Sequence, residues 1–484
     1  MEPILPKRTI LYSTHGSKHY LPPVNFSDHQ IICGPYYPTV GTRGNFRSIN
    51  TAAGEYDLQE TCRDLAPSER PDLIIVRADA SRQNWPRNVN QFTAQTVLVL
   101  GDTHHLKRPI SGLLKYAMDE NFDHILFDYN RQHAHFFVEA GFSNARWLPG
   151  FNVQRYHSPQ RRSIEHAFTF VGQMGSYHRY RRQVIDALLE KGIPLKTLTC
   201  PPHETQEIQS KSLLSLNVSL NGDLNQRVLE IIGSGSLCIT DRLQPQSGLG
   251  DLFSSKTEII TYTTPEDLTE RLRHFANTPA EALRIAKAGL TRFNNNYTTP
   301  HMVTEFEKIL QGQPGNPLFC LTREKRTSNA QHKVTRELEH RITLYEFAQS
   351  LHAENSALLV HFSAGVDPLI ATDMADLPRC SLSFSNRSPS QSQQAVKRRV
   401  EPGQIRHVCD SDRLQEPVHL FVTCVEDILN DSTCQRHLEN TSLCASVLLS
   451  DCTFEGSPNQ GKEILTNAGL NQNPNHPYYW SRGG

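Results

Sequence analysis

The sequence contains no run of about 18 apolar residues, the length that a helix needs to cross a bilayer. Its first residues also lack the long apolar core of a secretory signal peptide. The 11 cysteines form no C-x-x-C pair, and their spacings do not match those of zinc sites. These absences predict a cytoplasmic protein without a transmembrane segment, whose cysteines are mostly small core residues rather than disulfide partners.

An excess of charge of either sign is also missing, because 49 Lys and Arg residues stand against 50 Asp and Glu residues. A protein that binds nucleic acid or an anionic membrane through its overall charge needs a positive excess, so we predict no nucleic-acid partner. The 22 histidines include the pairs His104/His105 and His133/His135, but no third ligand stands at a recognisable spacing. We therefore predict no metal site.

What the sequence does contain is an alternation of short apolar runs with helix-like stretches. The runs are continuous and rich in branched residues, which is typical of strands buried on both faces of a parallel sheet. They lie at 9–12, 31–33, 71–76, 97–100 and 124–127, and again at 168–172, 193–199, 213–220, 237–240 and 258–262. Helical periodicity lies between and after them, at 111–120, 131–140, 181–190, 225–232 and 301–310. This alternation predicts an α/β fold.

The length of 484 residues corresponds to about three domains of about 150 residues each. Segments with proline and glycine at 147–159 and 312–317 are typical of linkers. We therefore predict domains at 1–157, 158–312 and 313–484. The last contains a helical pattern at 334–352 and weaker strands at 357–362, 380–384, 417–422 and 445–449, which predict a smaller C-terminal α/β domain.

The segment 213–241 is the strongest candidate for a binding site. In open α/β sheets, ligands bind beyond the carboxyl ends of strands, where helix N-termini present unpaired N–H groups. Here an apolar run leads into a polar loop and then into a helix that carries Arg227 and Glu230 one turn apart. The arginine could neutralise a phosphate, and the glutamate could accept hydrogen bonds from the two hydroxyls of a ribose. The same spacing also fits an exposed ion pair with no binding role.

An ordered set of motifs over residues 212–310 favours the binding role. The set comprises Leu216-Asn217, Arg227-Val228-Leu229-Glu230, Gly233-Ser234-Gly235, Thr240-Asp241, Glu258-Ile259-Ile260-Thr261-Tyr262, Pro265-Glu266-Asp267-Leu268 and Ala288-Gly289-Leu290-Thr291-Arg292. It resembles the C-terminal half of the group 1-type glycosyltransferases, and it is most similar to the branch that contains the spore-maturation-type glycosyltransferases. Upstream, Phe170-Val171-Gly172 with arginines at 179–182 is similar to a turn of that family, and the resemblance covers about residues 8–312.

The resemblance implies a GT-B architecture, in which two Rossmann-like domains face a cleft and the helix at 301–310 packs back toward the first domain. It implies a hexosyltransferase-type enzyme of glycan biosynthesis that uses a nucleotide-diphosphate sugar as its donor and favours the retaining over the inverting course. Such enzymes generally work without a bound metal, and no D-x-D motif stands in a plausible loop here. No cofactor is expected besides the donor substrate, and the acceptor would be a glycan, a lipid-linked molecule or a protein.

The resemblance also assigns roles to single residues. Glu230 would bind the donor ribose, and Arg227 would face the diphosphate and act in catalysis. Gly172 would let the backbone approach the phosphates, and Arg179, Arg181 or Arg182 would add positive charge. The set predicted to bind the donor is Gly172, Arg179, Arg182, Asn221, Asp223, Arg227 and Glu230. In the first domain, Asp102 and His104 are predicted to orient the acceptor or to act as a general base, with His15 as the alternative.

Two features leave other interpretations open. Many members of that family carry a donor-contacting glutamate where this chain has Gly222, with Asp223 beside it as the candidate substitute. The chain could therefore instead be a catalytically inactive GT-B-like binding or scaffold protein. In the last domain, the strand order and the run 358–362 resemble a class I methyltransferase, although the glycine-rich turn is missing. That resemblance would imply binding of S-adenosylmethionine; an interaction or acceptor-docking module is the other interpretation.

Overall fold

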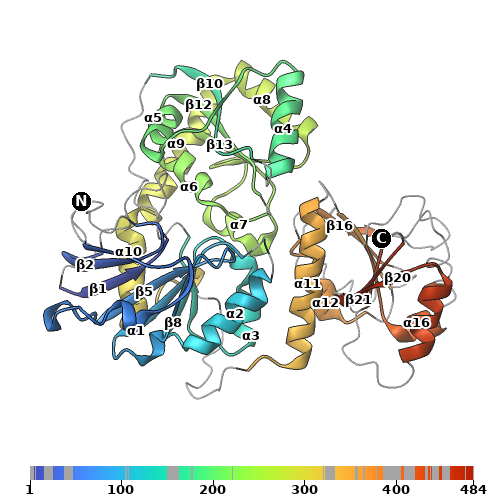
Figure 1. Cartoon of the computed structure of the whole chain (residues 1–484). Helices are drawn as coiled ribbons and strands as arrows, with labels where there is room; N and C mark the ends of the chain where they lie inside the picture. Colours follow the sequence, from blue (N-terminus) through green and yellow to red (C-terminus); the bar gives the residue numbers. More distant parts are fainter. Residues whose placement is uncertain are drawn as a thin grey trace. The chain divides into compact units, whose positions relative to one another are not determined.

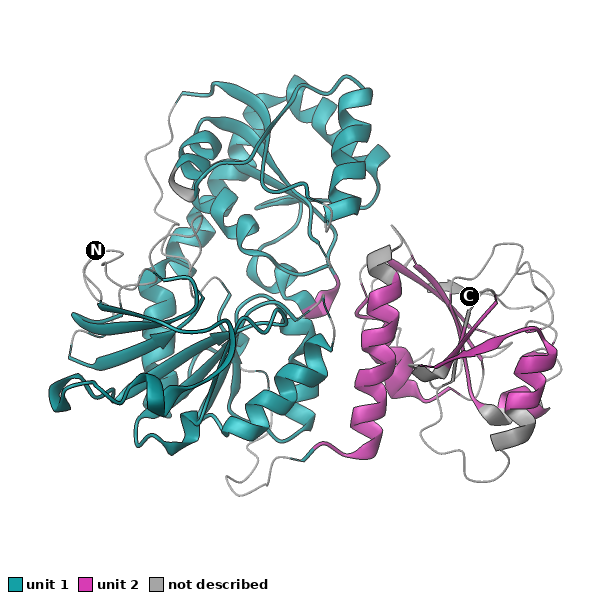
Figure 2. Ribbon diagram, viewed as in Figure 1, with its two compact units in different colours: residues 1–243, 247–333 teal, residues 244–246, 334–484 magenta. Residues whose placement is uncertain are grey.

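A computed structural model of the chain describes residues 5, 7–15, 26–37, 47–103, 106, 108–149, 163–175, 178–220, 222–319, 321, 333–354, 358–363, 366–377, 379–384, 405–407, 420–430, 434–435, 438, 446–449, 458–474 and 476–482. The chain divides into two compact units, residues 1–243 with 247–333 and residues 244–246 with 334–484 (Figure 2). Within the described ranges, none of the helices combines the length and the apolar character that a membrane span requires.

The first unit begins with a seven-stranded sheet in which all neighbours are parallel, in the order β3-β2-β1-β5-β7-β8-β9 (Figure 1). Its strands are β1 (Thr9–Ser13), β2 (His29–Gly34), β3 (Arg47–Asn50), β5 (Leu73–Ala78), β7 (Gln95–Leu100), β8 (His124–Phe127) and β9 (Ala145–Trp147). Two further strands, β4 (Gly54–Asp57) and β6 (Asn84–Arg87), pair with each other. The helices are α1 (Leu58–Thr61), α2 (Pro109–Glu120) and α3 (Ala134–Glu139). The central strands β5 and β7 are almost wholly buried, as their branched apolar residues predict.

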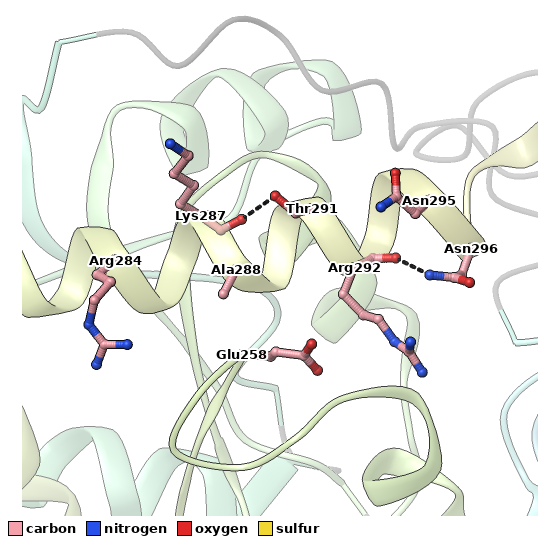
Figure 3. A pocket seen from close by; sticks show the side chains of 8 residues that line it. All are labelled: Glu258, Arg284, Lys287, Ala288, Thr291, Arg292, Asn295 and Asn296. Atoms are coloured by element: carbon pink, nitrogen blue, oxygen red, sulfur yellow. Dashed lines mark hydrogen bonds between the residues drawn. The ribbon is translucent and has the colours of Figure 1, made fainter.

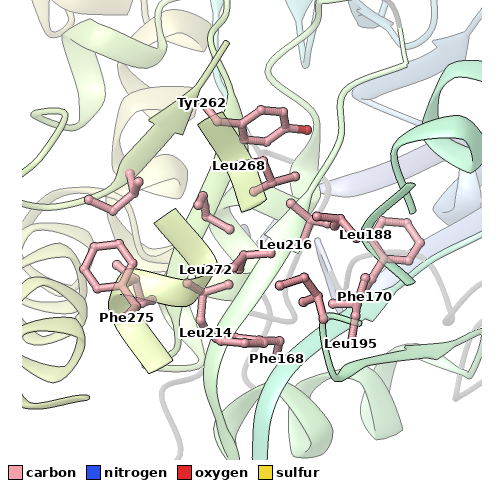
Figure 4. Packing of buried hydrophobic residues seen from close by; sticks show 14 of the residues in the cluster. Phe168, Phe170, Leu188, Leu195, Leu214, Leu216, Tyr262, Leu268, Leu272 and Phe275 are labelled. Carbon is pink, nitrogen blue, oxygen red and sulfur yellow. The ribbon is translucent and has the colours of Figure 1, made fainter. Parts of the chain in front are cut away.

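A second parallel sheet follows in the same unit, in the order β11-β10-β12-β13-β14. Its strands are β10 (His166–Val171), β11 (Leu195–Leu198), β12 (Ser212–Asn217), β13 (Leu237–Asp241) and β14 (Ile260–Tyr262). Its helices are α4 (Arg179–Glu190), α5 (Pro202–Ser210), α6 (Gln226–Gly233), α7 (Leu249–Leu252), α8 (Pro265–Asn277) and α9 (Pro279–Asn296). Leucines of α4 and α8, among them Leu188, Leu268 and Leu272, pack with Phe168 and Leu214 of the sheet into one buried core (Figure 4).

The helix α10 (Thr299–Leu310) contacts the first sheet and its loops. The ring of Phe306 lies 6.2 Å from that of Phe26, and the side-chain amide of Gln95 at the start of β7 donates to the carbonyl of Leu310 at 2.8 Å. The expectation that the helix at 301–310 packs back toward the first domain is therefore confirmed.

The second unit has its own seven-stranded sheet, in the order β17-β16-β15-β18-β19-β21-β20. Its strands are β15 (Leu358–Phe362), β16 (Cys380–Phe384), β17 (Ile405–His407), β18 (Leu420–Thr423), β19 (Ser446–Leu449), β20 (Asn471–Asn473) and β21 (His476–Ser481). The first five are parallel to one another, and β21 runs antiparallel to both of its neighbours. The helices are α11 (Arg336–Glu354), α12 (Pro368–Met374), α14 (Val425–Asn430) and α16 (Pro458–Asn467).

These sheets confirm the predicted α/β class: two parallel, Rossmann-like sheets lie in the first unit, and a further α/β sheet forms the second. The strands predicted at 124–127 and 380–384 coincide with β8 and β16. Strands β3 and β4 escaped prediction because they are short, polar and only partly buried, and α5 did so because its sequence has little apolar periodicity. The predicted boundary at 157/158 lies outside the described residues, and the division into domains at 1–157, 158–312 and 313–484 stays a prediction.

Candidate functional site

In the second sheet, the order in which the chain adds strands reverses between β10 and β12. The chain goes from β10 to its neighbour β11 on one side and later returns to β12 on the other. Connecting helices then lie on opposite faces of the sheet, and ligands of open α/β sheets bind at the carboxyl edge of such a switch point. Gly172 follows β10 there, Asn217 ends β12 and Asp241 ends β13. We call these residues, together with the start of α6 and the side chain of Arg181, the switch-point site.

Hydrogen bonds fix the loop between β12 and α6. The carboxylate of Asp241 accepts from the backbone N–H of Ser219 at 2.8 Å and also from its hydroxyl, which in turn accepts from the backbone N–H of Gly222 at 3.2 Å. Gly222 has a φ of 73°, a backbone conformation that glycine adopts without strain. The side chain of Asn225 then caps α6 by accepting from the N–H of Arg227 at 3.1 Å. Residue 222, where the glycosyltransferase resemblance predicts a glutamate, therefore has a backbone conformation that favours glycine.

Arg227 lies across the ring of Phe170. Its guanidinium carbon is 5.2 Å from the ring centroid, and Nη1 donates to Oδ1 of Asn217 at 3.3 Å. A Cβ atom added to Gly172 would lie 2.4 Å from Nη2 of Arg227, so the guanidinium can occupy this place only because residue 172 has no side chain. The alternative of an exposed ion pair does not describe this arginine, because its head group lies on an aromatic ring and bonds a fully buried asparagine.

A second arginine, Arg181, lies against the same ring. Its guanidinium carbon is 5.8 Å from the centroid of Phe170, and the side chain is 5% exposed. Nε and Nη2 donate to the carbonyl of Val218 at 3.2 and 3.1 Å, and Nη1 donates to the carbonyl of Gln173 at 2.9 Å. Two guanidinium groups therefore share one aromatic ring at the edge of the sheet.

The predicted donor residues Arg179 and Arg182 lie outside the buried face of α4. Both are exposed, and a guanidinium nitrogen of Arg182 donates to the carbonyl of Met174. Arg181 instead falls at i, i+4, i+7 with Ile185 and Leu188, which form the buried face of the helix. The structure thus groups Arg181 with Arg227, while the roles predicted for Arg179 and Arg182 stay predictions.

Keeping these two guanidinium groups charged costs free energy, because they are removed from water and lie close to each other. Burial, followed by the charge of Arg227, lowers the pKa of Arg181 to about 9, while Asp223 and Asp241 act in the opposite direction. Burial also lowers the pKa of Arg227, with Glu230 and Asp223 opposing it. A desolvated cation is stabilised by any negative charge that comes close, so this edge of the sheet is suited to an anion.

Glu230 lies one turn after Arg227 and is half-buried. The side-chain amide of Gln226 donates to its Oε1 at 2.8 Å. Asp223 is 5% exposed and contributes negative charge near both arginines. The remaining predicted donor residue, Asn221, lies outside the described residues.

The first sheet also carries polar groups at the carboxyl ends of its strands. Asp102 follows β7 and is half-buried, and its carbonyl accepts from the N–H of Ala80 at 2.9 Å. His104 lies outside the described residues, so its predicted pairing with Asp102 has no geometry here. The alternative residue, His15, is half-buried, and burial lowers its pKa against the opposing charge of Asp79.

Several residues of the site were not assigned a role from the sequence. Asn217, Ser219 and Asp241 position the arginine and the loop, and Phe170 supports both guanidinium groups. The Leu-Asn and Thr-Asp motifs at the strand ends were the signal for two of them, because polar residues that end buried strands stand at the binding edge.

Within the described segments, no group of three or more His, Cys, Asp or Glu side chains could hold a metal ion. The cysteines of these segments are free thiols, and most are buried: Cys33, Cys238, Cys380, Cys424 and Cys434.

A cavity of about 490 Å³ lies along α9, and it shares no residue with the switch-point site (Figure 3). It is lined by cationic and amide side chains of the helix and by one carboxylate: Glu258, Arg284, Lys287, Ala288, Thr291, Arg292, Asn295 and Asn296. Glu258 accepts from the N–H of Ser254 at 2.8 Å, and its carbonyl lies where a Cβ on Gly289 would collide with it at 2.4 Å. Glu258 therefore has a packing role beside α9.

Comparison with known proteins gives one family and several distant structures. Residues 154–308 match a family described as glycosyl transferase-like. No curated protein matches the sequence. Sucrose-phosphate synthase from Thermosynechococcus elongatus is 12% identical, with a TM-score of 0.46 over 63% of this chain and 99% of that chain. Anabaena HepE in complex with UDP and glucose is also 12% identical, with a TM-score of 0.45 and the same coverage. TarM is 11% identical, with a TM-score of 0.39 over 51% of this chain and 57% of that chain, so this chain spans little more than half of the length of TarM.

Proposed function

We propose that this chain, with its glycosyl transferase-like region at residues 154–308, transfers a sugar from a nucleotide-diphosphate sugar to an acceptor hydroxyl. The observation that carries the proposal is the pair of guanidinium groups of Arg181 and Arg227 on Phe170, at the switch point of a parallel sheet. A donor diphosphate at this edge would give the two guanidinium groups a direct contact with negative charge, which none of the described carboxylates makes with them.

The chemistry follows from where charge develops in the reaction. When the bond between the sugar and the diphosphate breaks, negative charge grows on the leaving oxygen, and cations already in place stabilise it without reorganisation. Arg227 is held for this task by Asn217 and Phe170, and Arg181 by two backbone carbonyls. The N-terminus of α6 adds its partial positive charge beside them. No step in this scheme requires a metal ion, and we propose a metal-independent transfer.

Glu230 is the proposed contact for the ribose of the donor. A carboxylate accepts hydrogen bonds from both hydroxyls of a vicinal diol, and Glu230 stands one turn behind Arg227 on the same helix. Asp223, Gly172 and Asn221 are proposed as further donor contacts, with Arg179 and Arg182 as cations at the outer side of α4.

The acceptor is proposed to bind at the carboxyl edge of the first sheet, at Asp102 and His104 or at His15. In a retaining transfer the departing phosphate can take the proton of the acceptor hydroxyl, so these residues would orient the acceptor rather than act as an essential base. The acceptor classes proposed are glycans, lipid-linked molecules and proteins, and the protein would act in the cytoplasm.

The experiment that tests the donor site is a thermal-shift panel with UDP, GDP, ADP, CDP and S-adenosylhomocysteine, on the wild type and on Glu230→Ala. A ligand at a hundred times its dissociation constant stabilises the folded protein by about 2.7 kcal/mol, which gives a clear rise in Tm. One nucleoside diphosphate should raise the Tm of the wild type and fail to do so in Glu230→Ala. Glu190→Ala, which removes an exposed glutamate at the end of α4, is the matched control and should respond like the wild type.

The outcomes distinguish the two interpretations of the first unit. Nucleotide binding with slow hydrolysis of the donor sugar supports the transferase. Binding without any hydrolysis supports the inactive binding or scaffold protein. Equal Tm shifts with the nucleotide in Glu230→Ala and the wild type would show that Glu230 does not contact the nucleotide.

A second candidate function, methyl transfer by the C-terminal domain, is supported by the strand order of the second unit. Its sheet carries an antiparallel β21 between β19 and β20, and its switch point lies between β15 and β18. The hydroxyl of Ser363 follows β15 at this point; it is buried and has no hydrogen-bond partner within the described segments. A Tm rise with S-adenosylhomocysteine that Ser363→Val abolishes would support this candidate, and no response at millimolar concentration would contradict it.

A further inference from the structure

A chain of hydrogen bonds reaches Glu230 from the first sheet. Arg77 of β5 forms an ion pair with Asp128 at 3.5 Å and donates from Nη2 to the hydroxyl of Tyr129 at 3.4 Å. The hydroxyl of Tyr129 donates to Oε1 of Gln226 at 2.7 Å, and Nε2 of Gln226 donates to Oε1 of Glu230 at 2.8 Å. Asp128 and Tyr129 directly follow β8, and Gln226 is the first residue of α6.

The chemistry of the groups determines which atom donates in each of these hydrogen bonds. A guanidinium can only donate, so the oxygen of Tyr129 is the acceptor toward Arg77 and its proton is available for Gln226. The amide of Gln226 must then turn its oxygen toward Tyr129, which leaves its NH₂ group for the carboxylate of Glu230. Hydrogen bonds aligned in this way polarise one another, so each strengthens the next.

We propose that Tyr129 and Gln226 are positioning residues that orient the carboxylate of Glu230 for the ribose of the donor. This inference rests on the proposed function, because it needs Glu230 to be the ribose contact. A glutamate side chain on a helix can adopt several rotamers, and the hydrogen bond from Gln226 restricts Glu230 to one of them. Tyr129 acts one step further away, because it fixes which end of the Gln226 amide faces the glutamate.

The proposal has a specific consequence for the kind of ligand recognised. An oriented Glu230 discriminates a ribonucleotide from its 2′-deoxy form, because only the former offers both hydroxyls to the carboxylate. Loss of a hydrogen bond to a charged group weakens binding by about 10- to 100-fold, so the wild type should prefer the ribonucleotide by that factor. Removing the hydroxyl of Tyr129 should narrow this preference by about three- to tenfold, the effect of one neutral hydrogen bond.

The test is isothermal titration of UDP, GDP, ADP and CDP and their 2′-deoxy forms into the wild type, Tyr129→Phe, Gln226→Leu and the double variant. Tyr129→Phe should weaken the ribonucleotide that binds the wild type while leaving its deoxy form nearly unchanged. The double variant should be no worse than Gln226→Leu alone, because both residues act on Glu230 through one chain. Tyr116→Phe is the matched control, since it removes another tyrosine hydroxyl bond of 2.8 Å, to the carbonyl of Pro86.

Each outcome has a defined meaning. Equal weakening of the ribo and deoxy forms in Tyr129→Phe would show a general structural effect and overturn the positioning role. An unchanged preference in Tyr129→Phe, or additive losses in the double variant, would also overturn it while leaving the proposed function intact. Failure of every nucleotide to bind the wild type would instead overturn the proposed function, and this inference with it.

Discussion

Replacing Gly172 with alanine should disable the switch-point site while leaving the fold almost intact. A Cβ at residue 172 would lie 2.4 Å from Nη2 and 2.8 Å from Cζ of Arg227, and 3.2 Å from the ring of Phe170. The first two distances are too short for any real contact, so the guanidinium must move. It can do so at low cost, because it is the end of a flexible side chain and the backbone next to it need not shift.

The structure gives the size of the two effects. The displaced guanidinium loses its 3.3 Å hydrogen bond to Asn217 and its place on Phe170. A hydrogen bond of that length is among the weaker ones that a charged group forms. Together with the contact to the ring, its loss should lower the free energy of unfolding by about 1–2 kcal/mol. Nucleotide binding should suffer more, because a charge-assisted contact to the diphosphate would be lost, at about 2–3 kcal/mol or roughly 30- to 160-fold in Kd.

Two measurements on Gly172→Ala check this: urea denaturation for stability and isothermal titration for the Kd of the nucleoside diphosphate. Gly250→Ala is the matched control, since a Cβ on Gly250 meets nothing within 4 Å, and both quantities should stay close to the wild type. Unchanged nucleotide affinity in Gly172→Ala would refute the reasoning, because it would mean that Arg227 contributes nothing to binding from its place on Phe170.

Two further predictions concern buried arginines. Burial and the charge of Arg227 lower the pKa of Arg181 to about 9 in the free site, and a bound diphosphate would raise it. Binding therefore favours the protonated arginine, so the Kd measured by titration calorimetry should be constant below about pH 8 and rise above pH 9. Arg181→Met should lose this dependence, the exposed neighbour variant Arg182→Met should keep it, and a flat profile in the wild type would contradict the link. In the second unit, Asp373→Asn should cost about 3–5 kcal/mol in urea denaturation, because it leaves the buried guanidinium of Arg341 without its carboxylate, whereas the exposed Glu339→Gln should cost almost nothing. A midpoint for Asp373→Asn equal to that of the wild type would show that the pair is not needed.

The sequence allowed the central strands and the Arg227/Glu230 helix to be predicted. A strand that is buried on both faces appears as a continuous apolar run, and a helix appears as apolar residues that recur with the helical period. Strands β5, β7 and β8 carry that signal clearly. It failed for β3 and β4, whose residues are polar or exposed, and the pairing of β21 between β19 and β20 depends on contacts that local sequence does not encode.

The choice among the arginines of α4 shows where sequence reasoning stopped. This helix begins with three arginines within four positions, and the residue type alone does not distinguish them. Only the helical period places Arg181 on the same face as the buried residues Ile185 and Leu188. The same period was available in the sequence, so this part could have been predicted. The bond from Tyr129 to Gln226 could not, since it joins residues 97 positions apart that share no motif.

Two arginine arrangements in this chain differ in a way that supports the proposed ligand binding. In the second unit, Arg341 meets Asp373 through two hydrogen bonds of 2.8 and 2.9 Å, so its charge is already balanced inside the protein. Arg181 and Arg227 instead bond only carbonyl and amide oxygens, and neither forms an ion pair within the part of the chain that the structure describes. A pair of desolvated cations without a contacting carboxylate lowers the stability of the empty protein, since burial and mutual repulsion both disfavour the charged forms. Such a cost is typical of functional sites, where a ligand can add a contacting negative charge to the more distant ones of residues such as Asp223 and Asp241. An exposed surface pair would need no such ligand, and a purely structural pair would resemble Arg341 and Asp373. The arrangement on Phe170 is neither, which supports the proposal that an anionic donor group binds there.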